Sequence, residues 1–135
     1  MTDRTTKQIG IAIVEFDGYY VVGTRQVGQV LAGFSEFPGG KCEPGEPPED
    51  CAARECLEET GLVVIPVRLM EKTEHDYTHA TVELHFWLCR VDGVSDETRG
   101  TMPPLINKFQ WKSVDELREL AFPEANASIL DLLVQ

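Results

Sequence analysis

Residues 40–62, GKCEPGEPPEDCAARECLEETGL, constrain this chain more than any other segment. Residues three and four apart are neighbours on a helix surface, so a helix here places Glu55 beside both Glu58 and Glu59. Like charges at this spacing destabilise a helix by roughly 0.2–0.5 kcal/mol per pair. A divalent cation between the carboxylates would relieve that repulsion, and the alternative is a solvated helix face.

The flanking residues define the bounds of this helix. The Pro47-Pro48 pair suits a helix start and Gly61 suits its end, which predicts a helix over Pro48–Thr60. Its other face carries small side chains that suit close packing on a sheet. Gly39 and Gly40 can adopt backbone conformations closed to other residues, so we expect a glycine turn that approaches a ligand closely.

Clustered oxygen ligands are what Mg²⁺ and Mn²⁺ prefer, and Mg²⁺ takes its remaining ligands from water and substrate phosphates. The segment therefore predicts a phosphate-handling site with Mg²⁺ as cofactor and Mn²⁺ as a possible substitute. A formal net charge of −11 argues against sequence-independent binding to nucleic acid, which relies on Lys and Arg. A small-molecule nucleotide remains compatible, because metal ions bridge an acidic site to a triphosphate.

The spacing of this segment resembles a known motif. Glycine, five residues, glutamate, seven residues, then R-E-U-x-E-E-x-G-U, with U a bulky apolar residue, is the box of the Nudix hydrolase family. Its positions here are Gly40, Glu46, Arg54, Glu55, Cys56, Glu58, Glu59, Gly61 and Leu62. Only Cys56 departs, as a small hydrophobe at a packing position. The resemblance implies an α/β fold, an α/β/α sandwich with a central mixed β-sheet, and a single Nudix domain over residues 1–135.

The resemblance also implies roles for the residues of the box. The implied metal ligands are the carbonyl of Gly40 and the carboxylates of Glu55, Glu58 and Glu59. The implied catalytic set is Glu55, Arg54, Glu58 and Glu46, in which Glu55 or a partner activates the water. Arg54 would orient the catalytic carboxylate and pair with Glu46. The alternative for that pair is an ordinary salt bridge between a loop and a helix.

Similarity to the bacterial MutT branch of the family, the 8-oxo-dGTP diphosphatases, extends over nearly the whole chain. The matching stretches are EFPGGK, LMEKTEHDY, LHFWL, WKSVDEL and FPEAN. The last motif implies that Asn126 reads a purine edge, since an amide donates and accepts at once, and the alternative is a helix N-cap. Arg25, Phe37 and Tyr77 align with nucleotide-contacting positions, and Lys41 is a candidate phosphate contact. The alternative for Phe37 is a core position.

Two positions depart from the type enzyme of that branch. Ala80 stands where that enzyme has an arginine, and residues 102–110 contain no acid where it has an additional glutamate near the metal. Because of Ala80, selectivity for 8-oxoguanine does not follow from the box alone. Because of the missing acid, one metal-binding subsite does not follow from it either.

Periodicity predicts the remaining elements. Strands are expected over residues 9–14, 19–24, 63–73, 81–91 and 109–111, with Asp17-Gly18 as the turn of a hairpin between the first two. A loop is expected over residues 25–34 and an exposed turn or mobile loop over residues 92–100. Ser113 and Glu116 form a capping box for a helix through Leu120, and residues 126–134 predict an amphipathic helix.

The cysteines and nearby polar residues have less certain roles. Cys42, Cys51, Cys56 and Cys89 show no C-x-x-C pair, so we interpret them as reduced thiols. A zinc site of His79, His85 and Cys89 lacks the close ligand pairs of structural zinc sites. We expect Glu83 to face solvent rather than to bind a ligand.

The chain shows no apolar run long enough to span a membrane, and its start, MTDRTTKQ, lacks the apolar stretch of a signal peptide. We therefore expect a cytoplasmic protein without a membrane partner. A monomer and a homodimer both remain open.

The leading hypothesis is a Mg²⁺-dependent pyrophosphohydrolase that cuts 8-oxo-dGTP or a related (d)NTP into a nucleoside monophosphate and pyrophosphate. One alternative is the same chemistry on ADP-ribose, a nucleotide sugar or a dinucleoside polyphosphate. A second alternative is a nucleotide-sensing Nudix module without catalysis. Such modules typically lose box carboxylates, and this chain retains all of them.

Overall fold

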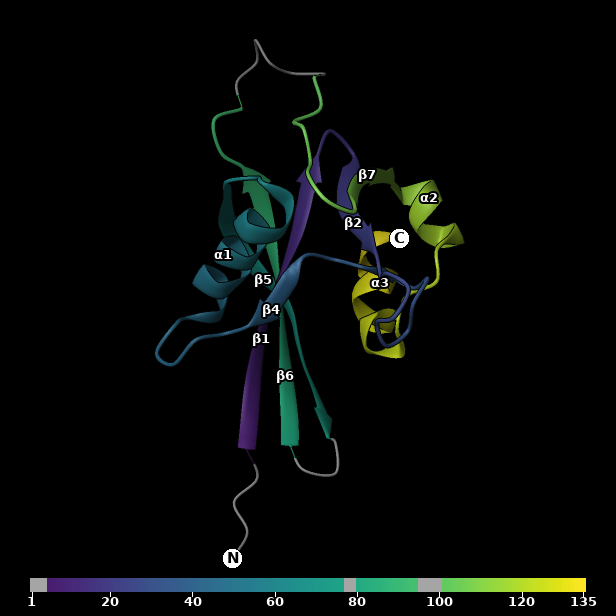
Figure 1. Ribbon diagram of the computed structural model, residues 1–135. Coiled ribbons are helices and arrows are strands. Elements are labelled where there is room, and N and C mark those ends of the chain that lie inside the picture. Colours follow the sequence, from purple (N-terminus) through teal and green to yellow (C-terminus); the bar gives the residue numbers. More distant parts are fainter. Residues whose placement is uncertain (1–4, 77–79, 95–100) are drawn as a thin grey trace, which may run out of the picture.

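The computed structural model describes residues 5–76, 80–94 and 101–135, and these form three layers (Figure 1). A mixed sheet is the middle layer, with α1 against one face and α2 and α3 against the other. The strands are β1 (Thr5–Phe16), β2 (Tyr19–Thr24), β3 (Ser35–Glu36), β4 (Gly39–Lys41), β5 (Val64–Asp76), β6 (Ala80–Val91) and β7 (Phe109–Ser113). The helices are α1 (Pro48–Thr60), α2 (Val114–Glu119) and α3 (Ala127–Leu133), with the short 3₁₀-helix η2 (Glu124–Asn126) before α3. The predicted α/β/α sandwich is confirmed.

Strand β1 joins the two halves of the sheet. Along one edge it runs parallel to β6, which pairs antiparallel with β5. Along its other edge it pairs antiparallel with β4 at residues 9–11 and with β2 at residues 15–16. β2 in turn pairs with β3 and β7. The short strand β4 therefore lies within the sheet, next to β1 and in contact with α1.

Both faces of β1 are buried, because successive side chains of a strand point to opposite faces. Ile13 packs with Leu117 of α2 and Ile129 of α3. The next residue, Val14, belongs to the cluster on the other face, which contains Ala52 of α1. Burial of an aliphatic side chain of this size stabilises the fold by about 1.5–3 kcal/mol. The alternation seen in the sequence thus fixes α1 and the C-terminal helices on opposite sides.

The hairpin expected between β1 and β2 is confirmed. Asp17 and Gly18 have φ angles of 53° and 84°. Positive φ at both central residues is the type I′ turn, whose twist matches that of the flanking strands. The register pairs Phe16 with Tyr19 and Glu15 with Tyr20.

The glycine turn expected before α1 is wrong. Gly39 and Gly40 form β4 with Lys41, and neither glycine has a positive φ angle. The pairing of β4 with residues 9–11 of β1 holds this backbone extended. The predicted bounds of α1 are confirmed, with Gly61 in the left-handed region at φ 82°.

The C-terminal elements follow the sequence closely. Ser113 Oγ accepts a hydrogen bond from the backbone N–H of Glu116, whose carboxylate accepts from the N–H of Ser113, so the capping box is confirmed. The last helix begins at Ala127, directly after η2. Most of the polar stretch 92–100 lies outside the described residues. Within the part of the chain that is described, no helix is long and apolar enough to cross a membrane.

The expectation that Glu83 faces solvent is wrong. Its side chain is only 15% exposed, and its carboxylate lies 3.7 Å from Lys72 Nζ and 3.5 Å from His85 Nε2. The physical reason is that β1 and β5 flank β6 on both edges, so Gln8 and Lys72 cover this carboxylate. His79 of the considered zinc site lies outside the described residues.

All four cysteines lie in the described ranges and are free thiols. Cys51, Cys56 and Cys89 are buried, and burial raises their pKa values to about 12, 11 and 12. These three thiols are therefore protonated at neutral pH, as expected for packing residues.

Candidate active site

Helix α1 packs closely against β1, and the lack of a side chain at Gly10 allows this. A Cβ atom on Gly10 would lie 2.6 Å from the carbonyl oxygen of Pro48 and 2.8 Å from the backbone nitrogen of Ala52. Cys51 and Ala52, both fully buried, form the face of α1 that meets the sheet. Small side chains on both elements thus bring the glutamates of α1 next to β4.

The two glycines of β4 serve this close approach rather than a special backbone conformation. A Cβ atom on Gly40 would lie 2.4 Å from Glu55 Cδ. The backbone N–H of Gly39 donates to Glu59 Oε2 at 2.9 Å. The carbonyl of Gly40, an expected metal ligand, accepts a hydrogen bond from Cys51 Sγ at 3.2 Å.

Arg54 holds three glutamates together. Its Nε and Nη2 donate to both carboxylate oxygens of Glu46 at 2.8 and 3.0 Å, which is a bidentate pair. Its Nη1 donates to Glu55 at 3.0 Å and to Glu58 at 3.2 and 3.3 Å. Arg54 also reaches the backbone carbonyl of Lys41 at 3.3 Å. The salt bridge to the loop and the contact to the implied catalytic carboxylate therefore belong to one network.

The Glu46–Arg54 pair keeps its charges over a wide pH range. Hydrogen bonding from Arg54 lowers the pKa of Glu46 to about 2, and the backbone N–H of Glu43 adds to this effect. Hydrogen bonds to Glu46 and Glu58 raise the pKa of Arg54. Both partners are thus ionised throughout the neutral range.

Glu59 differs from the other carboxylates of α1. Its pKa is raised to about 7, chiefly by desolvation on burial, with the charges of Glu55 and Glu36 contributing and with the Gly39 N–H and Lys108 acting in the opposite direction. A carboxylate that is costly to ionise is stabilised by a nearby cation. Glu59 therefore has the environment expected of a residue that binds a cation.

The three carboxylates of α1 do not converge on one point. Glu55 is 18% exposed and faces β4, whereas Glu58 is 58% exposed. Among the described residues, no group of three His, Cys, Asp or Glu side chains is arranged to hold a metal ion. The carboxylates have different partners, because Arg54 pairs with Glu55 and Glu58 while Glu59 accepts from the backbone N–H of Gly39. The donor set of carboxylates and a carbonyl nevertheless suits a hard divalent cation.

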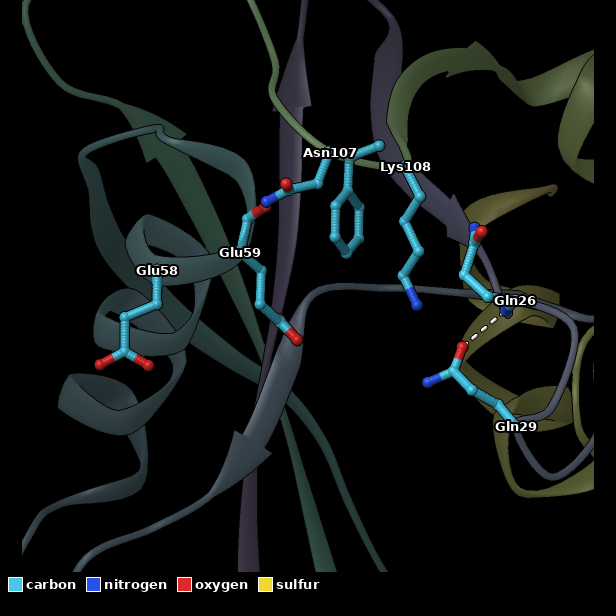
Figure 2. A pocket seen from close by; sticks show the side chains of 7 residues that line it. Gln26, Gln29, Glu58, Glu59, Asn107 and Lys108 are labelled. Atoms are coloured by element: carbon cyan, nitrogen blue, oxygen red, sulfur yellow. Dashed lines mark hydrogen bonds between the residues drawn. The ribbon is translucent and has the colours of Figure 1, made fainter.

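A cavity of about 620 Å³ opens beside these glutamates (Figure 2). We call it the carboxylate cavity, and it is lined by Glu58 and Glu59 of α1, Gln26 and Gln29 of the loop after β2, and Asn107 and Lys108 before β7. Its volume is typical of small-molecule sites. Three separate segments of the chain therefore meet at the expected phosphate site.

The sequence interpretation missed Glu36, Asn107 and Lys108. Glu36 accepts hydrogen bonds from Lys108 Nζ and, at 3.0 Å, from Arg25 Nη1. Asn107 Nδ2 donates to the backbone carbonyl of Glu59 at 2.8 Å. The available signals were a carboxylate directly before Phe37-Pro38 and a single charged residue, Lys108, in the apolar stretch 101–110.

A second pocket, of about 240 Å³, brings together three residues implied in base recognition. We call it the nucleoside pocket, and Arg25, Phe37 and Asn126 line it with Glu36, Gly39 and Leu84. Glu36 and Gly39 connect it to the carboxylate cavity, because they bond Lys108 and Glu59 respectively. The two spaces are therefore neighbours.

Two of these residues test the alternatives weighed from the sequence. Asn126 occupies the N-cap position of α3, but its side chain makes no capping hydrogen bond, and its Nδ2 lies 3.5 Å from the carbonyl oxygen of Pro123. Phe37 is 6% exposed and stacks on Phe122 at a centroid distance of 5.0 Å. Phe37 is thus a core residue that also forms part of the pocket wall.

Two implied substrate contacts lie elsewhere. Lys41 is exposed and lines a separate hollow with Glu43 and Glu46, so the structure does not bring it to the carboxylate cavity. Tyr77 lies outside the described residues. Arg25 is anchored by its own loop, since its Nε donates to the carbonyl of Val30 at 2.6 Å.

Comparison with known protein families identifies this arrangement. Residues 10–132 match the family described as NUDIX domain. The chain belongs to the Nudix family. The 8-oxo-dGTP diphosphatase of Escherichia coli (strain K12) is 32% identical over 125 residues, covering 91% of this chain and 92% of that protein. The 8-oxo-dGTP diphosphatase of Haemophilus influenzae is 35% identical over 137 residues, covering 98% and 94%.

Solved structures agree with this assignment. The E. coli ORF135 protein superposes with a TM-score of 0.72 at 25% identity, covering 95% of this chain and 88% of that chain. The MutT protein from Methanosarcina mazei Go1 gives a TM-score of 0.74 at 20% identity, covering 98% and 96%, and supports the fold alone. The prediction of a Nudix hydrolase with nucleotide pyrophosphohydrolase activity is confirmed. Nudix hydrolases act on small nucleotide substrates and generally need divalent metal ions.

Proposed function

We propose that this protein is a Mg²⁺-dependent nucleoside triphosphate pyrophosphohydrolase with a single Nudix domain, and that oxidised purine dNTPs such as 8-oxo-dGTP are its preferred substrates. The reaction adds water to a nucleoside triphosphate and releases a nucleoside monophosphate, pyrophosphate and a proton. The observation that carries the proposal is that hydrogen bonds join the walls of the two pockets, from Lys108 of the carboxylate cavity to Glu36 of the nucleoside pocket and from Gly39 of the nucleoside pocket to Glu59 of the carboxylate cavity. A nucleoside triphosphate could place its phosphates in the carboxylate cavity and its base in the nucleoside pocket.

The box residues would act by positioning. The carbonyl of Gly40 and the carboxylates of Glu55, Glu58 and Glu59 would hold the metal, with Mn²⁺ as a substitute. The bound cation would neutralise charge on the phosphates and lower the pKa of a water molecule. Arg54 holds Glu55 in place through the contact at 3.0 Å. Glu55, or the neighbouring Glu58, would accept the proton of the attacking water.

Base recognition would take place in the nucleoside pocket. The side-chain amide of Asn126 can donate and accept hydrogen bonds at a purine edge, and it is not used to cap α3. Leu84 and the ring of Phe37 supply apolar surface in the same pocket. Four relatives described as 8-oxo-dGTP diphosphatases support an oxidised purine as the base.

A substrate screen tests this proposal. The ratio kcat/KM would be measured by pyrophosphate release for 8-oxo-dGTP, dGTP and CTP. For ADP-ribose and a nucleotide sugar, it would be measured by the phosphate that alkaline phosphatase frees from the phosphomonoester products. CTP is included because the E. coli CTP pyrophosphohydrolase is 30% identical over 80 residues, which cover 59% of this chain and 59% of that protein. We expect the highest value for 8-oxo-dGTP. A higher value for ADP-ribose than for any dNTP would contradict the proposal.

Two isosteric variants test the assigned mechanism against a purely nucleotide-sensing module. Glu55→Gln and Glu58→Gln remove a charge and keep the shape, so we expect a loss of turnover of about 10³-fold or more with an unchanged fold. Circular dichroism and thermal unfolding would verify the fold. Wild-type turnover in both variants would remove the assigned mechanism.

A further inference from the structure

One wall of the carboxylate cavity carries a positive charge opposite the glutamates. Figure 2 shows the Lys108 side chain extending between Glu59 on one side and Gln29 on the other. Lys108 Nζ donates to Glu36 and lies 5.8 Å from the centroid of the Phe109 ring. An ammonium group has three N–H donors. One donor serves Glu36, so the others can serve a ligand in the cavity.

Gln29 adds donors to the same wall. Its Oε1 accepts a hydrogen bond from the backbone N–H of Gln26 at 2.5 Å, drawn as the dashed line in Figure 2. Because the oxygen is used in this way, the orientation of the amide is fixed. Its nitrogen lies on the cavity side in Figure 2. The amide therefore presents N–H groups, which bind anions, rather than an acceptor.

The segment that carries Lys108 is fastened to α1. Asn107 Nδ2 donates to the carbonyl of Glu59 at 2.8 Å, and the N–H of Ile106 donates to the carbonyl of Thr60 at 3.1 Å. Both carbonyls belong to the last turn of the helix, whose oxygens lack partners within the helix. These bonds fix the distance between the positive wall and the carboxylates.

We propose that Lys108 and Gln29 bind the two phosphates that leave as pyrophosphate, across the cavity from Glu58 and Glu59. This inference rests on the proposed function. Terminal phosphates bring negative charge next to carboxylates, and a cation with amide donors on the facing wall offsets that repulsion. A cavity of about 620 Å³ has room for both the phosphates and their cation.

Glu36 is the positioning residue in this arrangement. One of its oxygens accepts from Lys108, and the other accepts from Arg25 of the nucleoside pocket at 3.0 Å. The same carboxylate thus orients a phosphate-binding cation and a residue beside the base. Glu36→Gln should raise KM for a nucleoside triphosphate more than it lowers kcat, because it weakens binding at both ends of the substrate.

Binding of inorganic pyrophosphate tests the role of Lys108 without turnover. Isothermal titration calorimetry with Mg²⁺ present would compare the wild type with Lys108→Met, Lys108→Arg, Gln29→Leu and Lys112→Met. We expect Lys108→Met to raise the Kd for pyrophosphate by about 10- to 100-fold and Gln29→Leu to raise it by about tenfold. Lys108→Arg should recover most of the affinity. Lys112→Met is the matched control, since Lys112 pairs with Glu116 at 3.6 Å and does not line the cavity.

The outcomes separate this inference from the proposed function. Wild-type affinity in Lys108→Met, or no binding of pyrophosphate by the wild type, would overturn the inference. Equal losses in Lys108→Met and Lys112→Met would also overturn it, because a general charge effect would then explain the binding. Binding of pyrophosphate that depends on Lys108, in a protein that hydrolyses no nucleoside triphosphate, would support a diphosphate-binding role for Lys108 and overturn the proposed function.

Discussion

The carboxyl group of Glu55 lies where a side chain on Gly40 would begin, since a Cβ atom there would be 2.4 Å from Glu55 Cδ. The adjacent Gly39 meets backbone instead. A Cβ atom on Gly39 would lie 2.6 Å from the carbonyl oxygen of Gly10 and 2.9 Å from Ile11 Cα. The two glycines therefore serve different purposes. The lack of a side chain at Gly40 leaves room for the carboxylate of Glu55, and its lack at Gly39 allows β4 to pair with β1.

Gly40→Ala should reduce activity far more than stability. The new methyl group would displace Glu55, whose carboxylate is the end of a flexible side chain, and a displacement of about 1 Å can reduce turnover by about 100-fold. Gly39→Ala should instead cost about 1–3 kcal/mol of unfolding free energy, because backbone atoms must move. Urea denaturation and kcat for both variants would measure this contrast. The same loss of stability in both would contradict it.

Glu46→Gln should lower kcat although Glu46 lies outside the carboxylate cavity. The bidentate pair with Glu46 orients the Arg54 guanidinium that also contacts Glu55. Loss of such a supporting partner typically reduces activity by about 10- to 100-fold. Steady-state kinetics at saturating substrate would measure kcat, with unfolding free energy as the parallel measurement. A loss of stability with unchanged kcat would contradict this role and would mean that the Glu46–Arg54 pair is an ordinary salt bridge between a loop and a helix.

Arg54→Lys gives the complementary test. A lysine ammonium is a compact point charge and cannot make the planar contacts of a guanidinium to Glu46 and Glu55 at once. We expect kcat to fall by about 10- to 100-fold despite the conserved charge. Full activity in this variant would mean that charge alone, without geometry, supports the carboxylates.

Local patterns predicted the site helix, but contacts between distant segments decided how its residues are arranged. The spacing of Glu55, Glu58 and Glu59 fixed their common side of α1, because helix periodicity is a local property. Their separate partners depend on where β4 lies, and its pairing with β1 joins segments about thirty residues apart, beyond the reach of local composition. This is why Gly39 and Gly40 appeared to be a turn and are a strand.

The positive wall was even less accessible from the sequence. Lys108 and Glu36 are 72 residues apart, and their contact depends on the path of the chain between β6 and β7. Residues 102–110 contain no acid, and this absence does not predict a cation in the site. A lysine in an apolar stretch has no periodic signal, so the cation at that place became visible only in the fold.

The unfolding free energy of the metal-free protein should depend on Glu59 between pH 4.5 and about 7. Its pKa is raised above the unfolded value, so the folded state keeps a proton that the unfolded state loses. The contribution of protonated Glu59 to the unfolding free energy is therefore fully present below pH 4.5 and is lost as pH rises through about 7. Urea titrations of the wild type and Glu59→Gln should show a free-energy difference that changes in this window.

The affinity for Mg²⁺ should also depend on the ionisation of Glu59, but it should increase with pH where the stability decreases. A cation binds the deprotonated carboxylate, so affinity should increase with pH until Glu59 is ionised near pH 7. Calorimetric titration with Mg²⁺ at several pH values would measure this, with Glu59→Gln as the control that lacks the titrating group. An affinity for Mg²⁺ that is independent of pH across this window would argue against Glu59 as a ligand.

Asn107 should contribute to the site through its backbone as well as its side chain. Its φ angle is 59°, in the left-handed region that Asn tolerates and Ala does not, and its amide donates to the carbonyl of Glu59. Asn107→Gly removes the hydrogen bond without backbone strain, at a cost of about 0.5–1.5 kcal/mol, and adds an entropy cost of about 0.4–1 kcal/mol because glycine is more flexible in the unfolded chain. Asn107→Ala adds backbone strain of about 1–2 kcal/mol, so it should be the less stable variant although alanine loses less entropy on folding. Urea denaturation would rank the two, and the reverse order would show that the segment relaxes out of this conformation and that Lys108 is not held by it.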